Sequence, residues 1–214
     1  SNRMTNAIYL TTTEPYSGKS IIALGVMNLL AGKTEKIAYF KPVISSEGTD
    51  KDSHLDTISS HFNLNVPYKD MYVFTRNEVM KHINAGNEAF VIDTIIDRFK
   101  RLQERHDFVV VEGTDFKDNS TNMEFDGNIS IAKNLGIPAA LIVKGEGKSV
   151  QEIVDTAVST TKSFMDEGVQ ILTVVANKID LEKEEEIRAQ LGKALPKGLI
   201  ITSIPRNKDL GSPT

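Results

Sequence analysis

The hydrophobic positions of this chain fall into two patterns that alternate along its length. Short runs of consecutive apolar residues, many of them β-branched, are separated by longer stretches in which apolar residues recur every three or four positions. The runs predict strands that are buried on both faces, and the spaced positions predict amphipathic helices. The strongest strand signal is Phe108–Val111.

These patterns predict a regular succession of strands and helices. The expected strands are Ala7–Leu10, Ile37–Phe40, Met71–Phe74, Phe108–Val111, Ala139–Val143, Ile171–Ala176 and Leu199–Ile201. The expected helices are Lys19–Gly32, Asp52–Phe62, Glu78–Ile83, Ala89–Arg105, Asn128–Leu135, Ser149–Met165 and Glu182–Leu191, with a long polar loop at Gly113–Gly127. Such alternation indicates a three-layer α/β domain, in which helices flank a mainly parallel sheet with right-handed crossovers.

Composition narrows the class of protein. The chain has 214 residues, enough for one sizeable core, and its formal net charge of −4 argues against a general nucleic-acid binder. The absence of cysteine excludes disulfides, thiolate nucleophiles and sulfur-bound metals. The apolar runs are too short to cross a membrane, so we expect a cytoplasmic protein. Ser1–Arg3 before Met4 looks like a cloning remnant, which leaves 4–214 as a single domain, expected to be the N-terminal part of a longer protein.

The segment Thr13–Ser20 matches the phosphate-binding motif G-x-x-x-x-G-K-[ST] except at its first position, where threonine replaces glycine. It lies between a predicted strand and a predicted helix, the context that gives such a match meaning. Backbone amides at a helix N-terminus attract anions, and Gly18 allows a phosphate to approach closely. Lys19 would reach the β- and γ-phosphates of a nucleotide, and the Ser20 hydroxyl would bind magnesium.

Charged residues follow the next predicted strands. Glu112 ends the buried run at Phe108–Val111, where a carboxylate can hold magnesium or its water. Lys41 ends the second strand and could neutralise charge on a transferring phosphoryl group or a carboxylate substrate, or be an ordinary loop lysine. Asp52 stands where it would cap a helix, and capping alone would explain it.

Asn177-Lys178-Ile179-Asp180 has the N-K-x-D pattern of the guanine-recognition motif of GTPases, although a turn with exposed charges is an adequate alternative. No D-x-x-G follows the central strand, as it would in a GTPase. Asn177 alone remains a candidate contact to a nucleotide base. The four histidines, at positions 54, 61, 82 and 106, show no metal-ligand spacing and are expected to be surface or structural residues.

The run Tyr9–Ser20, followed by Ala23-Leu24-Gly25, resembles the opening of long bacterial phosphate acetyltransferases. In that family an N-terminal P-loop domain, similar to dethiobiotin synthetase and cobyrinate diamide synthase, precedes the catalytic domain. The resemblance extends through Phe40–Val43, Asp50–Asp56, Val111–Gly113, Asn177-Lys178, Ile204-Pro205 and Leu210–Thr214. This chain keeps Gly18-Lys19-Ser20, which some members of the family have lost.

The resemblance implies the dethiobiotin synthetase type of P-loop fold, with a seven-stranded, largely parallel sheet and a tendency to form dimers or larger homo-oligomers. It implies ATP and Mg²⁺ as cofactors and a nucleotide or small metabolite as the ligand. The residues expected to bind the nucleotide are Glu14, Tyr16, Ser17, Gly18, Lys19, Ser20 and Ile21, with Asn177 at the adenine. The residues expected to bind magnesium are Ser20, Asp52 and Glu112.

Three functions follow as alternatives. The first is a regulatory, nucleotide-binding domain of a phosphate acetyltransferase, whose acetyl transfer between acetyl-CoA and phosphate takes place in a catalytic domain outside this sequence. The second is a free-standing ATP-dependent ligase like dethiobiotin synthetase or cobyrinate diamide synthase, with Lys19 and Lys41 as catalytic cations. Thr12-Thr13-Glu14 departs from the Gly-Thr-Asp-type sequence of dethiobiotin synthetase at this point. The third is a GTPase-like switch.

Overall fold

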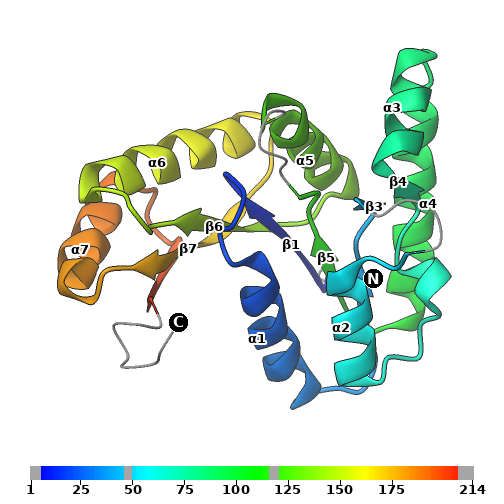
Figure 1. Cartoon of the computed structure of the whole chain (residues 1–214), viewed down its shortest axis with the longest axis horizontal. Coiled ribbons are helices and arrows are strands. Elements are labelled where there is room, and N and C mark those ends of the chain that lie inside the picture. Colours follow the sequence, from blue (N-terminus) through cyan, green and yellow to red (C-terminus); the bar gives the residue numbers. More distant parts are fainter. Residues whose placement is uncertain (1–5, 46–49, 116–120, 207–214) are drawn as a thin grey trace.

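A six-stranded parallel sheet forms the centre of the domain (Figure 1). In this computed structural model the described residues are 6–45, 50–115 and 121–206, without the side chains of 121–125. The strands are β1 Ala7–Thr12, β2 Ile37–Phe40, β5 Phe108–Glu112, β6 Ala139–Lys144, β7 Ile171–Ile179 and β8 Ile200–Pro205. Their order across the sheet is β2-β5-β1-β6-β7-β8, and every pairing is parallel.

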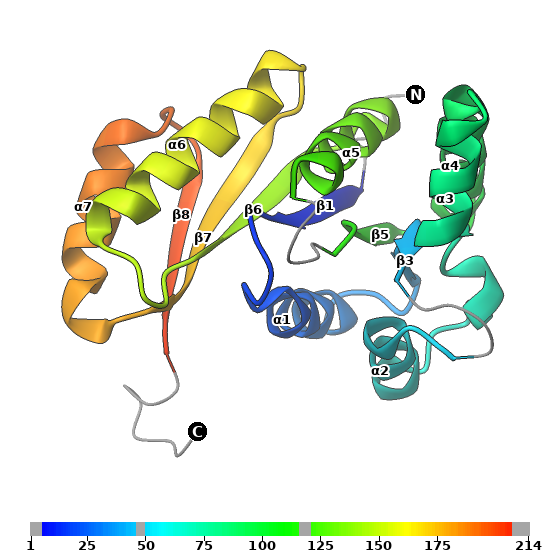
Figure 2. The same ribbon diagram turned by 45° about the horizontal axis from the view of Figure 1, so that its top comes forward.

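Helices cover both faces of the sheet, as the alternating pattern predicts. Helices α1 and α2 lie on one face, and α4, α5, α6 and α7 lie on the other, with α3 beside α4 (Figure 2). The bounds are α1 Lys19–Ala31, α2 Ser53–Phe62, α3 Arg76–Asn84, α4 Glu88–Arg105, α5 Thr121–Leu135, α6 Val150–Asp166 and α7 Glu184–Ala194. The three-layer α/β architecture is therefore confirmed.

The core lies where the sheet meets both helical layers. Val109, Val110 and Val111 of β5 are fully buried, because neighbouring strands flank them and helices cover both faces. Successive side chains of a strand point to opposite faces of the sheet. Because both faces are buried here, every position of β5 from Val109 to Val111 is apolar, and apolar and polar residues do not alternate. Among the described helices, none combines the length and the hydrophobicity that a membrane span requires.

Three details differ from the sequence prediction. The segment expected as a strand at Met71–Phe74 instead places Phe74–Thr75 (β4) beside Val43–Ile44 (β3) in a separate two-stranded sheet, after the 3-10 turn Tyr68–Asp70. The helix expected from Asn128 begins at Thr121 as α5, so the polar loop is shorter than predicted. The main sheet has six strands among the described residues rather than the seven that the resemblance implied.

The parallel topology gathers the carboxyl ends of the strands at one edge of the sheet. The loops after β1, β2, β5 and β7 all leave from this edge, which carries the sequence motifs. Binding sites of open α/β sheets form at such edges, where neighbouring connections depart to opposite faces. Here β1 leads into α1 on one face, while β5, its neighbour, leads into α5 on the other.

Candidate functional site: a phosphate loop beside a buried charge cluster

The loop between β1 and α1 has the backbone of a phosphate-binding turn. Gly18 caps α1 in the left-handed region, with φ 83°, and Tyr16 is left-handed as well, with φ 59°. Thr13 is not among the positive-φ residues of the described chain, so glycine is not required at the first motif position. Because α1 starts at Lys19, the amides of its first turn lack partners within the helix and face the loop.

Side chains from the neighbouring connections hold the loop in place. Asn177 on β7 donates a 2.9 Å hydrogen bond from Nδ2 to the Ser17 carbonyl oxygen, and Lys178 donates a 2.7 Å bond from Nζ to the Tyr16 carbonyl oxygen. The ammonium group of Lys148 lies 2.8 Å from the Glu14 carboxylate. A partly buried turn that is tethered at three points stays in one shape, which lowers the entropy cost of binding a ligand.

A cavity of about 410 Å³ opens over this loop. It is lined by the loop itself, including Lys19, Ser20 and Ile21, and by His54, Asp115 and Lys178 from neighbouring segments. The volume lies within the range of small-molecule sites, and the lining is rich in polar groups.

Lys19 is buried and bound within the protein in this structure. Its ammonium group donates to the Gly113 carbonyl oxygen at 2.7 Å and to the Asp115 carboxylate at 2.5 Å, and it lies 3.4 Å from Glu112. Its side chain is only 6% exposed. A bound polyphosphate would have to replace these contacts with its own oxygens.

Lys41 lies at the centre of the same cluster and is fully buried. Its ammonium group lies 2.9 Å from Asp52, 3.2 Å from Glu112 and 2.7 Å from Asp115. Burial by itself lowers the pKa of Lys41, but the three carboxylates raise it above its ordinary value, so the lysine stays charged.

Glu112 is the buried acid of the cluster. Its carboxylate accepts a hydrogen bond from the Tyr39 hydroxyl and lies 3.0 Å from Nδ1 of His54. Burial alone would raise the pKa of Glu112, but Lys19, Lys41 and His54 hold it well below its ordinary range. The Glu112 carboxylate is therefore ionised at neutral pH.

Asp52 has the capping role that its position in the sequence predicted. Its Oδ1 accepts hydrogen bonds from the His54 and Leu55 amides at the start of α2, and its Oδ2 pairs with Lys41. Both oxygens of the proposed magnesium ligand therefore have protein partners. A different group, His54, Glu112 and Asp115, has ligand atoms that all lie within 4.8 Å of one another.

The structure thus brings most of the predicted site together. Lys19, Ser20, Lys41, Asp52 and Glu112 all surround the junction of the phosphate loop with the ends of β2 and β5. Asn177 is 5% exposed and lies beneath the loop, and its role as an adenine contact stays a prediction.

Three residues of the site had no role in the sequence analysis: Asp115, His54 and Lys148. Asp115 lay in what was expected to be a long loop, and nothing in its local sequence marks it. His54 was expected to be surface or structural, whereas it is partly buried and bonded to Glu112. Lys178 was noted as part of the N-K-x-D pattern and of the family resemblance, with no role of its own. Asp180 of that pattern pairs with Arg206 and Lys183.

This fold and this loop define a P-loop domain of the nucleotide-binding class. The chain belongs to the family described as an AAA domain, whose model matches residues 6–214. That match covers nearly the whole chain, including every residue of the site described above.

Similar curated proteins bear out the resemblance seen in the sequence. The chain is 34% identical to the phosphate acetyltransferase of Nitratidesulfovibrio vulgaris, over 99% of this chain and 31% of that protein. It is 31% identical to the phosphate acetyltransferase of Synechocystis sp., over 95% of this chain and 30% of that protein. It is 24% identical to the ATP-dependent dethiobiotin synthetase BioD of Clostridium kluyveri, over 97% of this chain and 88% of that protein. The chain therefore spans about a third of the length of the phosphate acetyltransferases that it matches.

Solved structures support the fold. An ATP complex of McdA from Cyanothece matches with a TM-score of 0.58 and 12% identity, covering 94% of this chain and 82% of the other. A ParA family ATPase from Chlorobium tepidum matches with a TM-score of 0.55 and 11% identity, covering 96% of this chain and 86% of the other. At this level of identity the similarity establishes the architecture alone.

Proposed function

We propose that this domain binds Mg-ATP, or a closely related nucleotide, on the loop Thr11–Ser20 and that it serves as a regulatory domain of a phosphate acetyltransferase. The observation that carries the binding proposal is the tethered phosphate loop beneath a cavity of about 410 Å³, with Lys19 and Ser20 in its wall. The phosphates would lie against the first turn of α1, where the helix dipole and the free amides favour an anion.

The donor groups around the loop suit magnesium. Mg²⁺ prefers oxygen ligands, and the Ser20 hydroxyl with the Glu112 and Asp115 carboxylates offers such a set next to the phosphate position. The two lysines that now neutralise these carboxylates would turn toward the phosphates as the metal arrives. Asp52 is the weaker candidate because its oxygens cap α2 and pair with Lys41.

The regulatory role is supported by the phosphate acetyltransferase relatives, about a third of whose length this chain spans. Acetyl transfer between acetyl-CoA and phosphate would then take place in the remainder of the protein. We also propose that the domain acts in the cytoplasm and associates with copies of itself, as the resemblance implies.

Calorimetric titration with Mg-ATP tests the binding proposal directly. We expect saturable binding that weakens roughly tenfold to a hundredfold in Lys19→Ala, the range expected for a lost charged hydrogen bond. Lys33→Ala, at an exposed position just beyond α1, is the matched control and should bind like the parent chain. No heat from the parent chain up to millimolar nucleotide would sink the proposal.

The second candidate is an ATP-dependent ligase, which the dethiobiotin synthetase relative favours because the match covers 88% of that enzyme. Lys41 would then steady an acyl phosphate, although it is fully buried among three carboxylates in this structure. Release of ADP that depends on 7,8-diaminopelargonate and bicarbonate would favour this candidate. An inert mixture, from a chain that binds Mg-ATP, would leave the regulatory domain as the function.

A further inference from the structure

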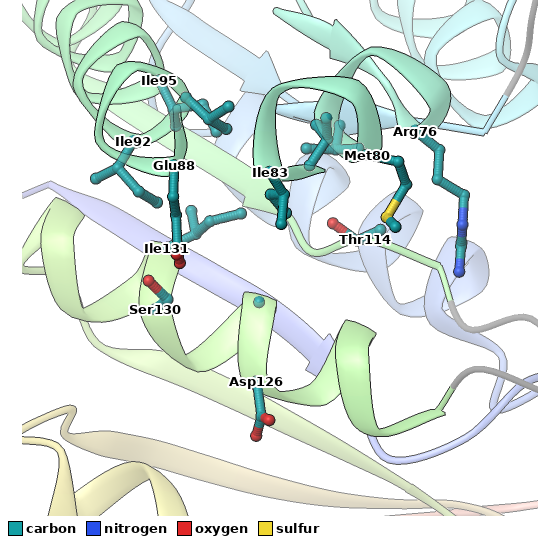
Figure 3. Close-up of a pocket in the computed structure, with 14 residues that line it drawn as sticks. Arg76, Met80, Ile83, Glu88, Ile92, Ile95, Thr114, Asp126, Ser130 and Ile131 are labelled. Carbon is teal, nitrogen blue, oxygen red and sulfur yellow. The ribbon is translucent and has the colours of Figure 1, made fainter. Parts of the chain in front are cut away.

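A second cavity lies between α3, α4 and α5 (Figure 3). Its volume is about 260 Å³, slightly below the usual range for small-molecule sites, so it suits a small ligand. Neither the phosphate loop nor the lysine and carboxylate cluster lines it. No feature of the proposed nucleotide site therefore accounts for this space.

The cavity is mostly apolar and lies between three helices. Most of its exposed lining surface comes from aliphatic side chains and one thioether, among them Val79, Met80, Ile83, Ile92, Ile95 and Ile131. Figure 3 shows Ile92 and Ile95 from α4, Met80 and Ile83 from α3, and Ile131 from α5 gathered around one space. Such walls favour a hydrocarbon group, because burying it removes apolar surface from water.

Of the three helices around the cavity, α3 is the least buried. It carries no buried residue among its nine, although its N-terminus is fixed by a capping box between Thr75 and Glu78. Its apolar side chains, Val79 and Ile83 among them, are only partly covered in the described structure. A ligand in the cavity would bury more of these side chains, and this burial favours binding.

The charged groups at the ends of the cavity differ in their surroundings. Glu88 and Asp126 are exposed, and Asp126 points away from the other labelled side chains in Figure 3. Arg76 is partly buried, and burial lowers its pKa although the Asp115 carboxylate raises it. A solvated carboxylate gains little from a cation, and Arg76 is the cationic side chain among the residues that line the cavity. The better-placed partner for a ligand is therefore the guanidinium group.

We propose that this cavity binds a small aliphatic carboxylate, with its hydrocarbon chain between α3, α4 and α5 and its carboxylate against Arg76. A planar guanidinium group offers paired donors that match the two oxygens of a carboxylate. Thr114 also lines the cavity, and its hydroxyl can serve as a further donor.

The site is connected to the phosphate loop through two consecutive residues. Thr114 lines the apolar cavity, and Asp115 lines the cavity over the loop. Arg76 donates a 3.3 Å hydrogen bond to the Asp115 carbonyl oxygen, and the Asp115 carboxylate holds Lys19. A bound carboxylate would add negative charge beside Asp115 and draw Arg76 toward itself. The two ligands therefore weaken each other, a coupling that rests on the proposed nucleotide function.

Hexanoate is the probe for the site, with hexylamine and acetate as controls for charge and chain length. Titration of the full chain, followed by NMR chemical shifts of α3 and α5 amides, should show saturable binding of hexanoate and no comparable binding of either control. Preferential binding of hexylamine would overturn the assignment of the carboxylate. Absence of binding by both six-carbon probes would overturn the site.

Two variants locate the binding. Arg76→Gln should weaken hexanoate binding roughly tenfold, as expected for a lost charged hydrogen bond, and Val79→Phe should abolish it by filling the cavity. Arg98→Gln is the matched control, because its guanidinium group on α4 bonds to the Lys69 and Tyr72 carbonyl oxygens away from the cavity. Undiminished binding in Val79→Phe would place the probe elsewhere and overturn the proposal.

The coupling is measured by repeating the hexanoate titration in saturating Mg-ATP. We expect at least a twofold loss of hexanoate affinity and the same factor for nucleotide in saturating hexanoate, since binding linkage is reciprocal. Equal affinities with and without nucleotide would overturn the coupling. A chain that binds hexanoate but no Mg-ATP would keep the apolar site and remove the proposed nucleotide function, so the two failures are distinguishable.

Discussion

The ammonium group of Lys19 lies 2.5 Å from Asp115, whose other carboxylate oxygen lies 2.7 Å from the ammonium group of Lys41. One acid thus joins the lysine of the phosphate loop to the most buried lysine of the protein. The charge of Lys19 is therefore already balanced by a carboxylate of the protein, that of Asp115. Any phosphate that binds at the loop must compete with Asp115 for this cation.

Replacing Asp115 by asparagine tests that competition. We expect Asp115→Asn to bind ATP without metal several-fold more tightly than the parent chain, because a competing negative charge is removed while the shape is retained. Calorimetric titrations with and without magnesium measure the effect. Asp155→Asn, at an exposed position on α6, is the charge-matched control.

The magnesium titration separates two roles of Asp115. Weaker binding of Mg-ATP in Asp115→Asn, together with stronger binding of ATP alone, would identify Asp115 as a ligand of the metal as well as a competitor for Lys19. Unchanged affinity in both titrations would contradict the competition, because the ion pair of Lys19 and Asp115 at 2.5 Å would then have no effect on nucleotide binding.

The buried position of Lys41 predicts a large loss of stability when its charge is removed. Lys41→Met leaves Asp52, Glu112 and Asp115 without their shared cation, and breaking a buried pair in this way costs about 3–5 kcal/mol of unfolding free energy. Urea denaturation measures the change. The comparison variant is Lys148→Met, whose pair with Glu14 is about 30% exposed on both sides and should contribute at most about 1 kcal/mol. Similar losses in both variants would contradict the special role of the buried cluster.

The sequence predicted those parts of the fold that depend on local pattern. All six strands of the main sheet were expected from their apolar runs, because strands buried on both faces must be apolar along their whole length. The extent of α5 was not predicted. Its first turns carry polar residues and end in Gly127, and the intrinsic cost of glycine in a helix, about 1 kcal/mol, made a loop the better local interpretation.

The site was predictable only as far as its motifs are continuous in sequence. Gly18-Lys19-Ser20 and the acid after the central strand follow from local context, because the loop and the strand end determine where they lie. Asp115 is 96 residues from Lys19, and its position depends on how β5 pairs beside β1. Asn177 matched a base-recognition pattern, yet its contact with Ser17 arises because β7 passes beneath the loop.

The contact between Asn177 and the phosphate loop predicts a strong interaction between two substitutions. A Cβ atom at residue 18 would lie 2.3 Å from Nδ2 of Asn177, and Gly18 has φ 83°, so Gly18→Ala adds both a clash and backbone strain. Strain in the left-handed region costs about 1–2 kcal/mol, and loss of a buried hydrogen bond in Asn177→Ala costs about 1–3 kcal/mol.

The double variant separates these costs. Because Asn177→Ala removes the clashing amide, Gly18→Ala should destabilise the Asn177→Ala chain by backbone strain alone. The double variant should therefore lose less unfolding free energy than the sum of the losses of the two single variants. The difference should be about 0.5–3 kcal/mol, as is usual for contacting residues. Strict additivity would mean that the loop shifts away from β7 to accommodate the methyl group.

The contact of His54 with Glu112 predicts how stability depends on pH. The hydrogen bond to Glu112 raises the pKa of His54 above 6.5, although burial and Lys41 oppose this and Asp115 supports it. The pKa of Glu112 and of Asp115 is lowered, chiefly by Lys19 and Lys41 against the effect of burial. The histidine therefore stabilises the fold fully below about pH 6.5, and this contribution is lost as the pH rises through its folded pKa. The two acids stabilise it above about pH 4.5, and their contribution is lost as the pH falls.

We expect the unfolding free energy from urea denaturation to be largest between about pH 4.5 and about pH 6.5. In His54→Gln the unfolding free energy should no longer decline above about pH 6.5, but it should still decline at acid pH. His61→Gln, near the end of α2, is the matched control. A decline above pH 6.5 that persists in His54→Gln would assign that titration to another group.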